Sequence, residues 1–221
     1  MLCLSRELIS ITGYLRTRMW SELAADARLS SRLRWPDQDS SLRRALIWLR
    51  SRGLLVLALQ RMSHRYMQRR AQHGWTLGLI LTRLLLALTR MPIMMVTKCD
   101  VGETVDIAPG VYLSDCGFLI LGMARIGSGT LIHERVTVGP RAGDAGKPVI
   151  GANVWIGPDC IIYGDLGDGA TVLPGSVVSI GVPSAAVAAG NPATIIRRQF
   201  DNAALRRTLA RDIDSGSLAP G

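Results

Sequence analysis

The sequence predicts two structural halves, a bundle of α-helices followed by a triangular parallel β-helix. Two observations support this fold class. Up to about Thr89 the apolar residues recur at helical spacing, and from about Val101 aliphatic residues recur every six positions. With 221 residues, 48% of them hydrophobic, the chain can bury one elongated core or two modest ones.

Residues 1–95 are expected to form the helical domain. From Ser21 onward, apolar residues lie three or four positions apart, as in the runs 42–49 and 54–59, and Gly53 and Gly74 separate the segments. The positive surplus behind the formal charge of +9 lies in this half, before Cys99. Its arginines are spread along the helical pattern rather than gathered with aromatic residues, which favours solvated helix faces over a nucleic-acid surface.

The segment from Trp75 to Val96 is the most apolar part of the chain. Arg83 and Arg90 interrupt it, and Pro92 is expected to break it before it reaches the roughly 20 clean residues that a membrane span needs. We therefore expect a buried interface helix here rather than a membrane helix.

Residues 96–198 are expected to form the β-helix. The leading aliphatic residue of each six-residue repeat, or hexad, should point inward; these residues are Ile107, Leu113, Leu119, Ile126, Ile132, Val138, Ile150, Ile156, Ile162, Leu166, Val172 and Val178. A second inward position follows four residues later and is mostly small or β-branched: Val111, Gly117, Met123, Thr130, Val136, Val154, Cys160, Ala170 and Ser176. Three hexads close one coil, so residues three hexads apart share a face, one rung of ~4.8 Å apart. The period does not give the handedness, although parallel crossovers are normally right-handed.

The four cysteines, Cys3, Cys99, Cys116 and Cys160, form no metal-ligand spacing with each other or with the three histidines. We expect reduced thiols, no metal and a cytoplasmic location. The N-terminal segment has no basic-then-apolar layout with a small-residue cleavage site, which agrees with that location.

The hexads, together with the segment Val182–Ile196, resemble the left-handed β-helix acyltransferases that carry hexapeptide repeats. The segment Arg52–Gln68 is similar to the helical segment that precedes the β-helix in serine acetyltransferases, with His64 at the helix histidine of that family. The resemblance covers about Ser21 to Arg198. It implies a left-handed β-helix, acetyl-CoA as co-substrate, and a small hydroxyl acceptor, L-serine by family default. It also implies a homotrimer, or a hexamer of two trimers, with sites between neighbouring prisms.

The chain departs from the family at the residues that handle the acceptor. The family's base is a histidine two places after a leading aliphatic residue, and a substrate-binding aspartate precedes it. Asp115 stands at that histidine and Ser114 at that aspartate, because the hexad of Leu113 stays in phase with Leu119. A slip of one residue would instead place Cys116 at the histidine.

Two further positions differ. Lys147 matches the family's second histidine, and Trp35 matches the substrate aspartate of the helical half. Since the missing groups would hold and deprotonate serine, the acceptor could equally be a sugar or another small alcohol.

O-Acetylation needs a base for the hydroxyl proton and donors for the oxyanion. Leu113 and Ile132 are three hexads apart, so Asp115 and Glu134 should lie on adjacent rungs, ~5 Å apart. One carboxyl of such a pair should hold its proton more tightly and can then act as a general base. The alternative is that two solvated acids simply avoid each other. His133 is a second candidate base, or else an ordinary exposed or interface histidine.

The side expected to bind acetyl-CoA is better preserved. The loop Gly139–Lys147 interrupts the hexads where the family's active-site loop protrudes. Gly157 and Gly175 are expected to allow close backbone approach to the pantetheine, and Arg197 and Arg198 to meet the nucleotide phosphates. Residues 199–221 are expected to form a short helix and a loose tail.

Three functions remain open from the sequence. The first is an active acetyltransferase on a hydroxyl acceptor. The second is a homologue that has lost catalysis and serves as a trimeric scaffold or binding protein. The third and weakest is an acyltransferase held at a membrane surface by its basic, apolar helical half.

Overall fold

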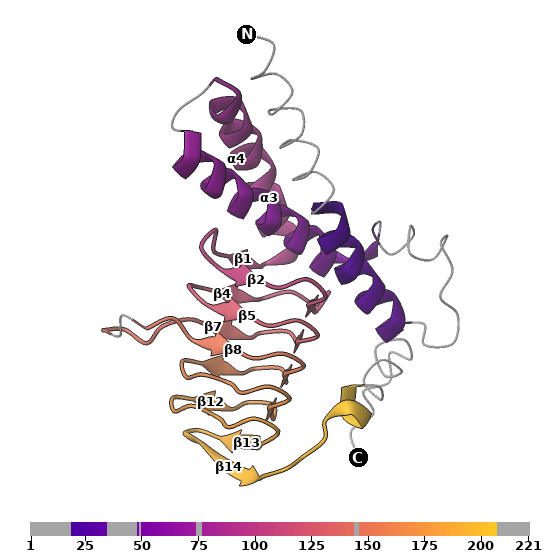
Figure 1. Cartoon of the computed structure of the whole chain (residues 1–221), viewed down its shortest axis with the longest axis vertical. Helices are drawn as coiled ribbons and strands as arrows, with labels where there is room; N and C mark the ends of the chain where they lie inside the picture. Colours follow the sequence, from indigo (N-terminus) through magenta and orange to yellow (C-terminus); the bar gives the residue numbers. More distant parts are fainter. Residues whose placement is uncertain (1–18, 35–47, 49, 74–76, 144–145, 207–221) are drawn as a thin grey trace.

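The computed structural model describes residues 19–34, 48, 50–73, 77–143 and 146–206. Residues 19–34 are helical, followed by α3 (Arg52–His73) and α4 (Leu77–Thr97). A β-solenoid of about five coils follows, and residues 203–206 form a helical turn. Helices α3 and α4 lie at one end of the solenoid, helix 19–34 runs beside its upper coils, and the chain winds away from α3 and α4 coil by coil (Figure 1). The expected run of apolar residues 42–49 lies largely outside the described residues.

The solenoid has three parallel sheets, one on each side of a triangular prism. The orders are β1-β4-β7-β10-β12, β2-β5-β8 and β14-β13-β11-β9-β6-β3. The strands are β1 (Asp100–Val101), β2 (Asp106–Ile107), β3 (Tyr112–Leu113), β4 (Ile120–Leu121), β5 (Arg125–Ile126), β6 (Leu131–Ile132), β7 (Thr137–Val138), β8 (Val149–Ile150), β9 (Trp155–Ile156), β10 (Ile161–Ile162), β11 (Thr171–Val172), β12 (Val177–Val178), β13 (Val187–Gly190) and β14 (Ala193–Arg197). The predicted helical half and β-helix are therefore confirmed.

One part of the predicted register is wrong. The strand pairing aligns Leu121 with Val138, so Leu121 is the leading inward residue and not Leu119. Leu119 is fully buried at the second inward position. The turn after Leu113 therefore holds two residues more than a regular hexad, and Gly117 and Phe118 both adopt positive φ there, +80° and +60°.

The same irregularity shifts the next second inward position. Ala124 is buried there, whereas Met123, which the six-residue period placed inward, is 44% exposed. The other leading residues of the period pair as expected, including the short hexad that ends at Leu166. An aliphatic side chain from each side of the prism thus fills every coil.

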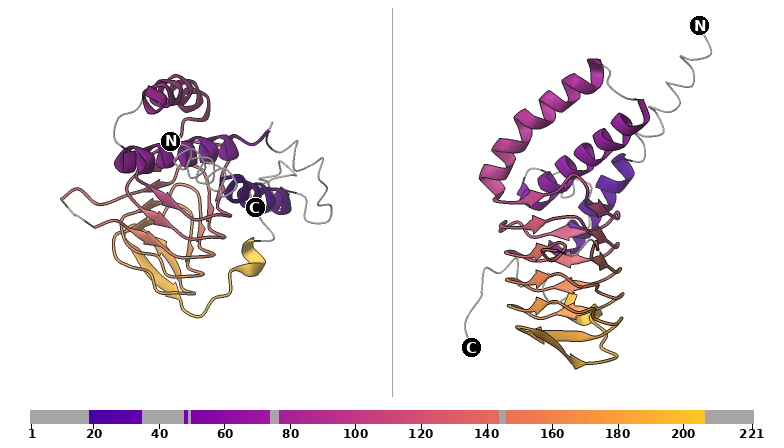
Figure 2. Two further views of the ribbon diagram at one scale, coloured as in Figure 1. Left: turned by 45° about the horizontal axis from the view of Figure 1, so that its top comes forward. Right: turned by 90° about the vertical axis from the view of Figure 1, so that its left-hand side faces the viewer.

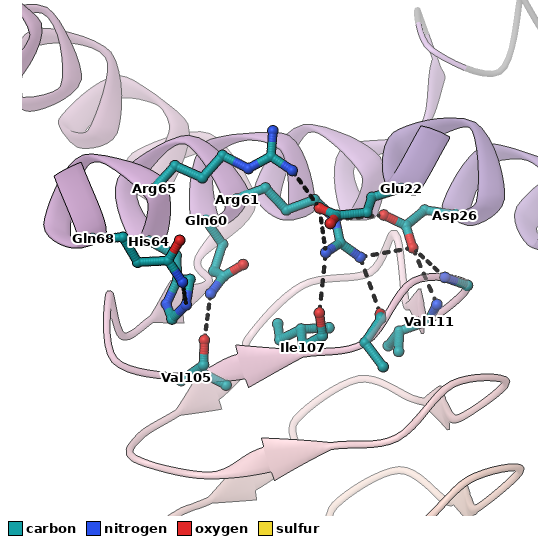
Figure 3. Close-up of polar contacts among 12 residues, drawn as sticks. Glu22, Asp26, Gln60, Arg61, His64, Arg65, Gln68, Val105, Ile107 and Val111 are labelled. Carbon is teal, nitrogen blue, oxygen red and sulfur yellow. Dashed lines mark hydrogen bonds and ion pairs between the residues drawn. The ribbon is translucent and has the colours of Figure 1, made fainter. Parts of the chain in front are cut away.

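A buried ion pair joins the helices to the first coil. Asp26 is fully buried and accepts two hydrogen bonds from Arg61 of α3, at 2.9 and 3.0 Å. The same carboxylate accepts the backbone amides of Gly110 and Val111, while Arg61 also donates to the carbonyl of Ile107 (Figure 3). Burial raises the pKa of Asp26, against the opposing effect of Arg61 and the two amides.

Helix α4 does not follow the expectation of a broken, buried helix. It continues through Pro92 to Thr97, and only 6% of its most apolar 18-residue window is buried inside the chain. The stretch Gly78–Thr97 has a mean hydropathy of 1.8 and is long and apolar enough to cross a membrane. Figure 2 shows α4 on the far side of α3 from the solenoid.

Candidate active site

The outer face of the six-stranded sheet is covered by helices. Because Leu131, Trp155 and Thr171 are paired on successive rungs, their side chains stack outside the prism. Leu131 and Trp155 are buried and pack with Leu29 of helix 19–34 and Leu205 near the C-terminus. This packing removes water from a face that would otherwise be exposed.

Three polar side chains on this covered face each carry a buried atom that has no hydrogen-bond partner within the described ranges. They are His133, Trp155 and Thr171, which we call the His133 cluster; their exposed fractions are 8%, 4% and 0%. The atoms without a partner are His133 Nε2, Trp155 Nε1 and Thr171 Oγ1. The His133 and Trp155 rings lie 5.1 Å apart at 60°. A buried polar atom without a partner costs about 1–3 kcal/mol, so these three atoms leave hydrogen-bonding capacity unused on one face.

The His133 cluster contains the groups that acyl transfer to a hydroxyl needs. Burial lowers the pKa of His133, and the nearby charge of Glu134 opposes this only in part. The imidazole is therefore neutral near pH 7 and can accept a proton at a ring nitrogen. Trp155 offers an N–H and Thr171 an O–H as hydrogen-bond donors.

Ser114 and Glu134 form a second polar contact beside the cluster. The Ser114 hydroxyl donates to Glu134 Oε2 at 3.0 Å and accepts the backbone amide of Cys116 at 3.2 Å. Ser114 is buried and its hydroxyl already donates to Glu134, so it can donate to an acceptor molecule only if it gives up that hydrogen bond.

Asp115 turns toward the helical half. Its carboxylate accepts hydrogen bonds from Arg34 at 2.6 Å, from the Ser51 hydroxyl at 2.7 Å and from the Gly53 amide at 2.9 Å. Ser51 precedes α3, and its hydroxyl also accepts the amide of Leu54 at 3.3 Å. Asp115 therefore sits at the N-terminus of α3, where free amides and the helix dipole stabilise a negative charge.

For the predicted carboxylate pair of Asp115 and Glu134, the structure shows the expected strand register but no direct contact. Leu113 pairs with Ile132, so Asp115 and Glu134 do follow paired positions on adjacent rungs. Each carboxylate has its own donors, however, and no hydrogen bond is recorded between the two, both of which lie in the described part of the chain. A shared proton between Asp115 and Glu134 stays a prediction with no direct contact behind it.

The remaining acceptor-side residues are spread apart. Lys147 is exposed just before β8, and among the described residues no ion pair joins it to Asp115 or Glu134. Cys116 is exposed and free, whereas Cys99 and Cys160 are free and buried. Trp35 lies outside the described residues. No group of three His, Cys, Asp or Glu side chains that could hold a metal occurs within the described ranges.

The residues that the sequence predicts to bind CoA lie in different environments. Gly139 is buried after β7, and a Cβ on Gly157 would lie 2.9 Å from the Pro174 nitrogen, so coil packing alone requires glycine at 157. Gly175 adopts a φ of +72° beside open space. Arg197 and Arg198 are exposed at and just after the end of β14, with Arg197 5.1 Å over the Phe200 ring. Open backbone and two exposed guanidiniums fit a pantetheine chain and phosphates.

His64 lies in a different place, at the joint between the two halves. Its Nδ1 is 3.1 Å from the Glu103 carbonyl oxygen, and its Nε2 is 3.0 Å from the Gln68 amide nitrogen. A cavity of about 160 Å³ adjoins it, lined by Glu22, Gln60, Arg61, His64, Arg65, Gln68, Asp106 and Ile107. Figure 3 shows the charged groups of this region bonded to one another. The groups drawn there therefore have hydrogen-bond partners without a ligand.

Reasoning from the sequence missed Trp155 and Thr171. Both stand one residue before a leading aliphatic residue, an outward position of the hexad. The available signal was their register: stacking the hexads places Leu131, Trp155 and Thr171 on successive rungs beside His133. The helical segments that cover this face could not be placed from the sequence.

Comparison with known proteins points to one enzyme class. No protein-family model matches the chain. Serine acetyltransferase 2 of Arabidopsis thaliana is 37% identical over 103 residues, which cover 44% of this chain and 32% of that protein. A serine acetyltransferase of Synechococcus elongatus is 27% identical over 186 residues, covering 81% and 70%. A chloramphenicol acetyltransferase of Agrobacterium fabrum is 43% identical over 60 residues, covering 26% and 29%. The chain thus spans about a third of the length of the Arabidopsis and Agrobacterium proteins.

Solved structures agree with these relatives. The soybean serine acetyltransferase apoenzyme superposes with a TM-score of 0.65 at 28% identity, over 80% of this chain and 69% of that one. A serine acetyltransferase of Neisseria gonorrhoeae in complex with serine shares the fold, with a TM-score of 0.65 at 24% identity over 87% and 75%. In sequence and architecture the chain is therefore similar to the serine acetyltransferases, and its β-solenoid has the fold of the left-handed β-helix acyltransferases.

Proposed function

We propose that this protein is an acetyl-CoA-dependent O-acetyltransferase that acts on a small hydroxyl acceptor. The supporting observation is that sequence similarity to serine acetyltransferases extends over 81% of the chain, through both the helical half and the β-helix. Soybean serine acetyltransferase, at 27% identity, has been solved in complex with serine. L-Serine is accordingly the first acceptor to test, followed by sugars and amino alcohols, because Asp115, Ser114 and Lys147 replace the family's acceptor-side residues.

The proposal assigns the base to His133 rather than to Asp115. The unpartnered Nε2 of His133, in a neutral ring, can take the proton of an acceptor hydroxyl as its oxygen attacks the acetyl thioester. Trp155, whose ring lies 5.1 Å from that of His133, supplies an N–H, and Thr171 on the next rung supplies an O–H; both suit the negative charge that develops on the carbonyl oxygen. The proton then passes to the departing CoA sulfur, and the ester and free thiol are released.

The CoA arm of the proposal rests on residues that follow β7 and β11 and on two at and just after the end of β14. Arg197 and Arg198 would bind its phosphates, and the backbone at Gly139 and Gly175 would border its pantetheine chain. A serine acetyltransferase of the same fold, 23% identical, has been solved in complex with CoA. Acetyl-CoA supplies the activated acetyl group, and no metal is part of the proposal.

A second function is favoured by the contacts of Asp115. The residue at the family's histidine position caps α3 and binds Arg34, a structural role that a scaffold would retain after losing catalysis. In this alternative the protein keeps the architecture, binds a partner and transfers nothing. The proposed setting in either case is a cytoplasmic homotrimer or hexamer.

Thiol release from acetyl-CoA decides between these functions. The purified protein is mixed with acetyl-CoA and either L-serine or a panel of sugars and amino alcohols, and free thiol is measured. We expect acceptor-dependent release, with His133→Gln lowering kcat roughly 10²- to 10⁴-fold and Asp115→Asn changing kcat only a few-fold.

Two results would contradict this assignment. Loss of activity in Asp115→Asn with retention in His133→Gln would move the base back to Asp115. No thiol release with any acceptor, together with no heat of binding for CoA in calorimetry, would support the scaffold.

A further inference from the structure

Helix α4 presents two faces of opposite character. The inner face, toward α3 and the first coil, carries Leu79 and Leu86, which are buried. It also carries both charged residues of the helix. Arg83 and Arg90 donate to Glu103 at 2.7 and 3.1 Å. The charges of α4 are therefore neutralised on the side that faces the protein.

The outer face of α4 consists of apolar side chains without a charge among them. They are Ile80, Leu81, Leu84, Leu85, Leu88, Met91, Met95 and Val96, with exposed fractions from 49% to 66%. A helix with this composition is normally the core of a domain or in contact with lipid. The first case does not apply, because the helix is almost entirely unburied in the chain.

The few polar side chains of α4 outside its inner face form hydrogen bonds to the backbone of the same helix. The Thr82 hydroxyl donates to the Gly78 carbonyl at 2.8 Å, and the Thr89 hydroxyl donates to the Leu85 carbonyl at 2.9 Å. A protein partner would find almost nothing on this face to which it could donate or from which it could accept a hydrogen bond. Specific protein interfaces carry about one hydrogen bond per 100–200 Å².

The charge of the surrounding half is complementary to a lipid surface. Of the 26 Lys and Arg residues, 17 precede Cys99, whereas only five of the 17 Asp and Glu residues do. Basic segments are attracted to anionic headgroups over about a Debye length. A free-standing apolar helix beside such a basic half matches the pattern of helices that lie in the membrane interface.

We propose that the outer face of α4 lies on an anionic lipid surface and holds the protein there. The helix would lie in the plane of the membrane and not cross it, because crossing would require Arg83 and Arg90 to leave Glu103 and enter hydrocarbon. This assignment differs from the expectation formed on the sequence, in which the two arginines interrupted the apolar stretch. Their inward orientation is what leaves the outer face uncharged.

Vesicle flotation tests the proposal with the full-length protein. Vesicles of phosphatidylcholine alone are compared with vesicles that also contain phosphatidylglycerol. The test variant is Leu84→Gln/Leu88→Gln, which changes two side chains of the outer face that are 58% and 64% exposed. The matched control is Ile180→Gln, an apolar residue that is 79% exposed beyond β12 at the other end of the molecule.

We expect the wild type and Ile180→Gln to float with the phosphatidylglycerol vesicles and to float less with phosphatidylcholine alone. The double variant should lose at least tenfold in partition coefficient while keeping its circular dichroism spectrum and its thiol release in solution. As a second readout, Leu85→Trp fluorescence should be quenched by brominated acyl chains.

The contrary results are distinct from a failure of the proposed activity. If the wild type stays with the aqueous phase and the double variant lowers the particle mass in light scattering, the outer face is an interface between copies of the chain. Equal flotation of the wild type and the double variant would also overturn the proposal. Neither result depends on whether acetyl transfer is observed.

Discussion

Asp115 has a structural role where the helical half meets the solenoid. At the N-terminus of α3 it accepts one backbone amide and one hydroxyl and pairs with Arg34, so it fastens the helical half to the turn after β3. An imidazole cannot accept three hydrogen bonds from these donors at once. The carboxylate suits this place for a reason of structure that stands apart from catalysis.

Replacing Asp115 by Ala should therefore cost stability. Removing a partly buried carboxylate that accepts three hydrogen bonds should lower the free energy of unfolding by about 1–3 kcal/mol. The control is Asp159→Ala, which removes an exposed ion pair with Arg135 and should change stability by less than about 1 kcal/mol. Urea unfolding measures the free energy of unfolding of both variants. Equal losses would show that Asp115 contributes no more than an exposed ion pair.

His133 should show its environment in the pH dependence of the reaction. Burial lowers its pKa, so the neutral, proton-accepting form persists below the ordinary histidine value of 6.5. If His133 is the base, kcat/KM should fall on the acid side with a midpoint below pH 6.5. A midpoint above pH 6.5 would contradict the assignment, and so would an unchanged profile in His133→Gln.

At the scale of elements, the turn between β3 and β4 decides how the helices meet the solenoid. Gly117 adopts a φ of +80°, and a Cβ there would overlap the carbonyl oxygen of Thr97 at the end of α4. The turn thus packs its backbone directly against the helix. Only glycine permits both the dihedral angle and the approach.

Gly117→Ala should destabilise the protein more than an alanine placed at another positive-φ glycine. Gly175 has a similar φ of +72° with nothing within 4 Å of the added Cβ, so Gly175→Ala reports the cost of the dihedral angle alone, about 1–2 kcal/mol. Gly117→Ala adds a backbone overlap to that cost. Thermal melting compares the two variants, and similar losses would show that the turn moves freely.

The joint between α3 and the first coil gives a second prediction. Arg61→Met should lower the free energy of unfolding by about 3–5 kcal/mol, because it leaves the fully buried Asp26 carboxylate without its cation. Adding Asp26→Asn to Arg61→Met should recover part of the loss, since the uncompensated charge is gone. A double variant less stable than Arg61→Met in urea unfolding would contradict this account.

At this scale most of the fold can be predicted from the sequence, but part of the strand register cannot. The six-residue period predicts the prism because aliphatic residues are needed at fixed inward positions. It fails between Leu113 and Ile126, where Leu119 and Leu121 are both buried and either one can lead the strand. Pairing with Val138 on the next coil settles the choice, and that contact is not local.

For the candidate site, the sequence supplies His133 and the alignment of Asp115 with Glu134. It does not give the orientation of these side chains. The residues that donate to Asp115 are Arg34, Ser51 and Gly53, which precede it by 81, 64 and 62 positions along the chain. The same holds for α4, where the position of Glu103 turns both arginines inward. Contacts of this range depend on how the two halves dock.

At the scale of the whole molecule, the sheet β1-β4-β7-β10-β12 leaves apolar residues on its outer face. Ile120, Ile161 and Val177 lie on this side, with Thr137 on the rung between Ile120 and Ile161, and Ile120 is 55% exposed. A neighbouring prism packed on this face would bury them, in agreement with the trimer that the resemblance implies.

Light scattering should therefore give a particle mass that is a multiple of three chains of 23.9 kDa. Ile161→Lys should reduce that mass, since it places a charge in the proposed contact, and its circular dichroism spectrum should stay unchanged. A monomeric wild type, or a variant of undiminished mass, would remove this face from the assembly.

The two ends of the solenoid are closed in different ways. At one end Gly53 of α3 lies against the carbonyl of Leu113, and at the other β14 pairs antiparallel with β13. A parallel β-solenoid whose last rung stayed open would offer its unpaired amides and carbonyls to the first rung of another copy, and growth could continue without limit. The helix and the reversed strand stop this growth. Deleting the final hairpin should thus expose a template for fibre formation, a hazard that the intact chain avoids through its topology.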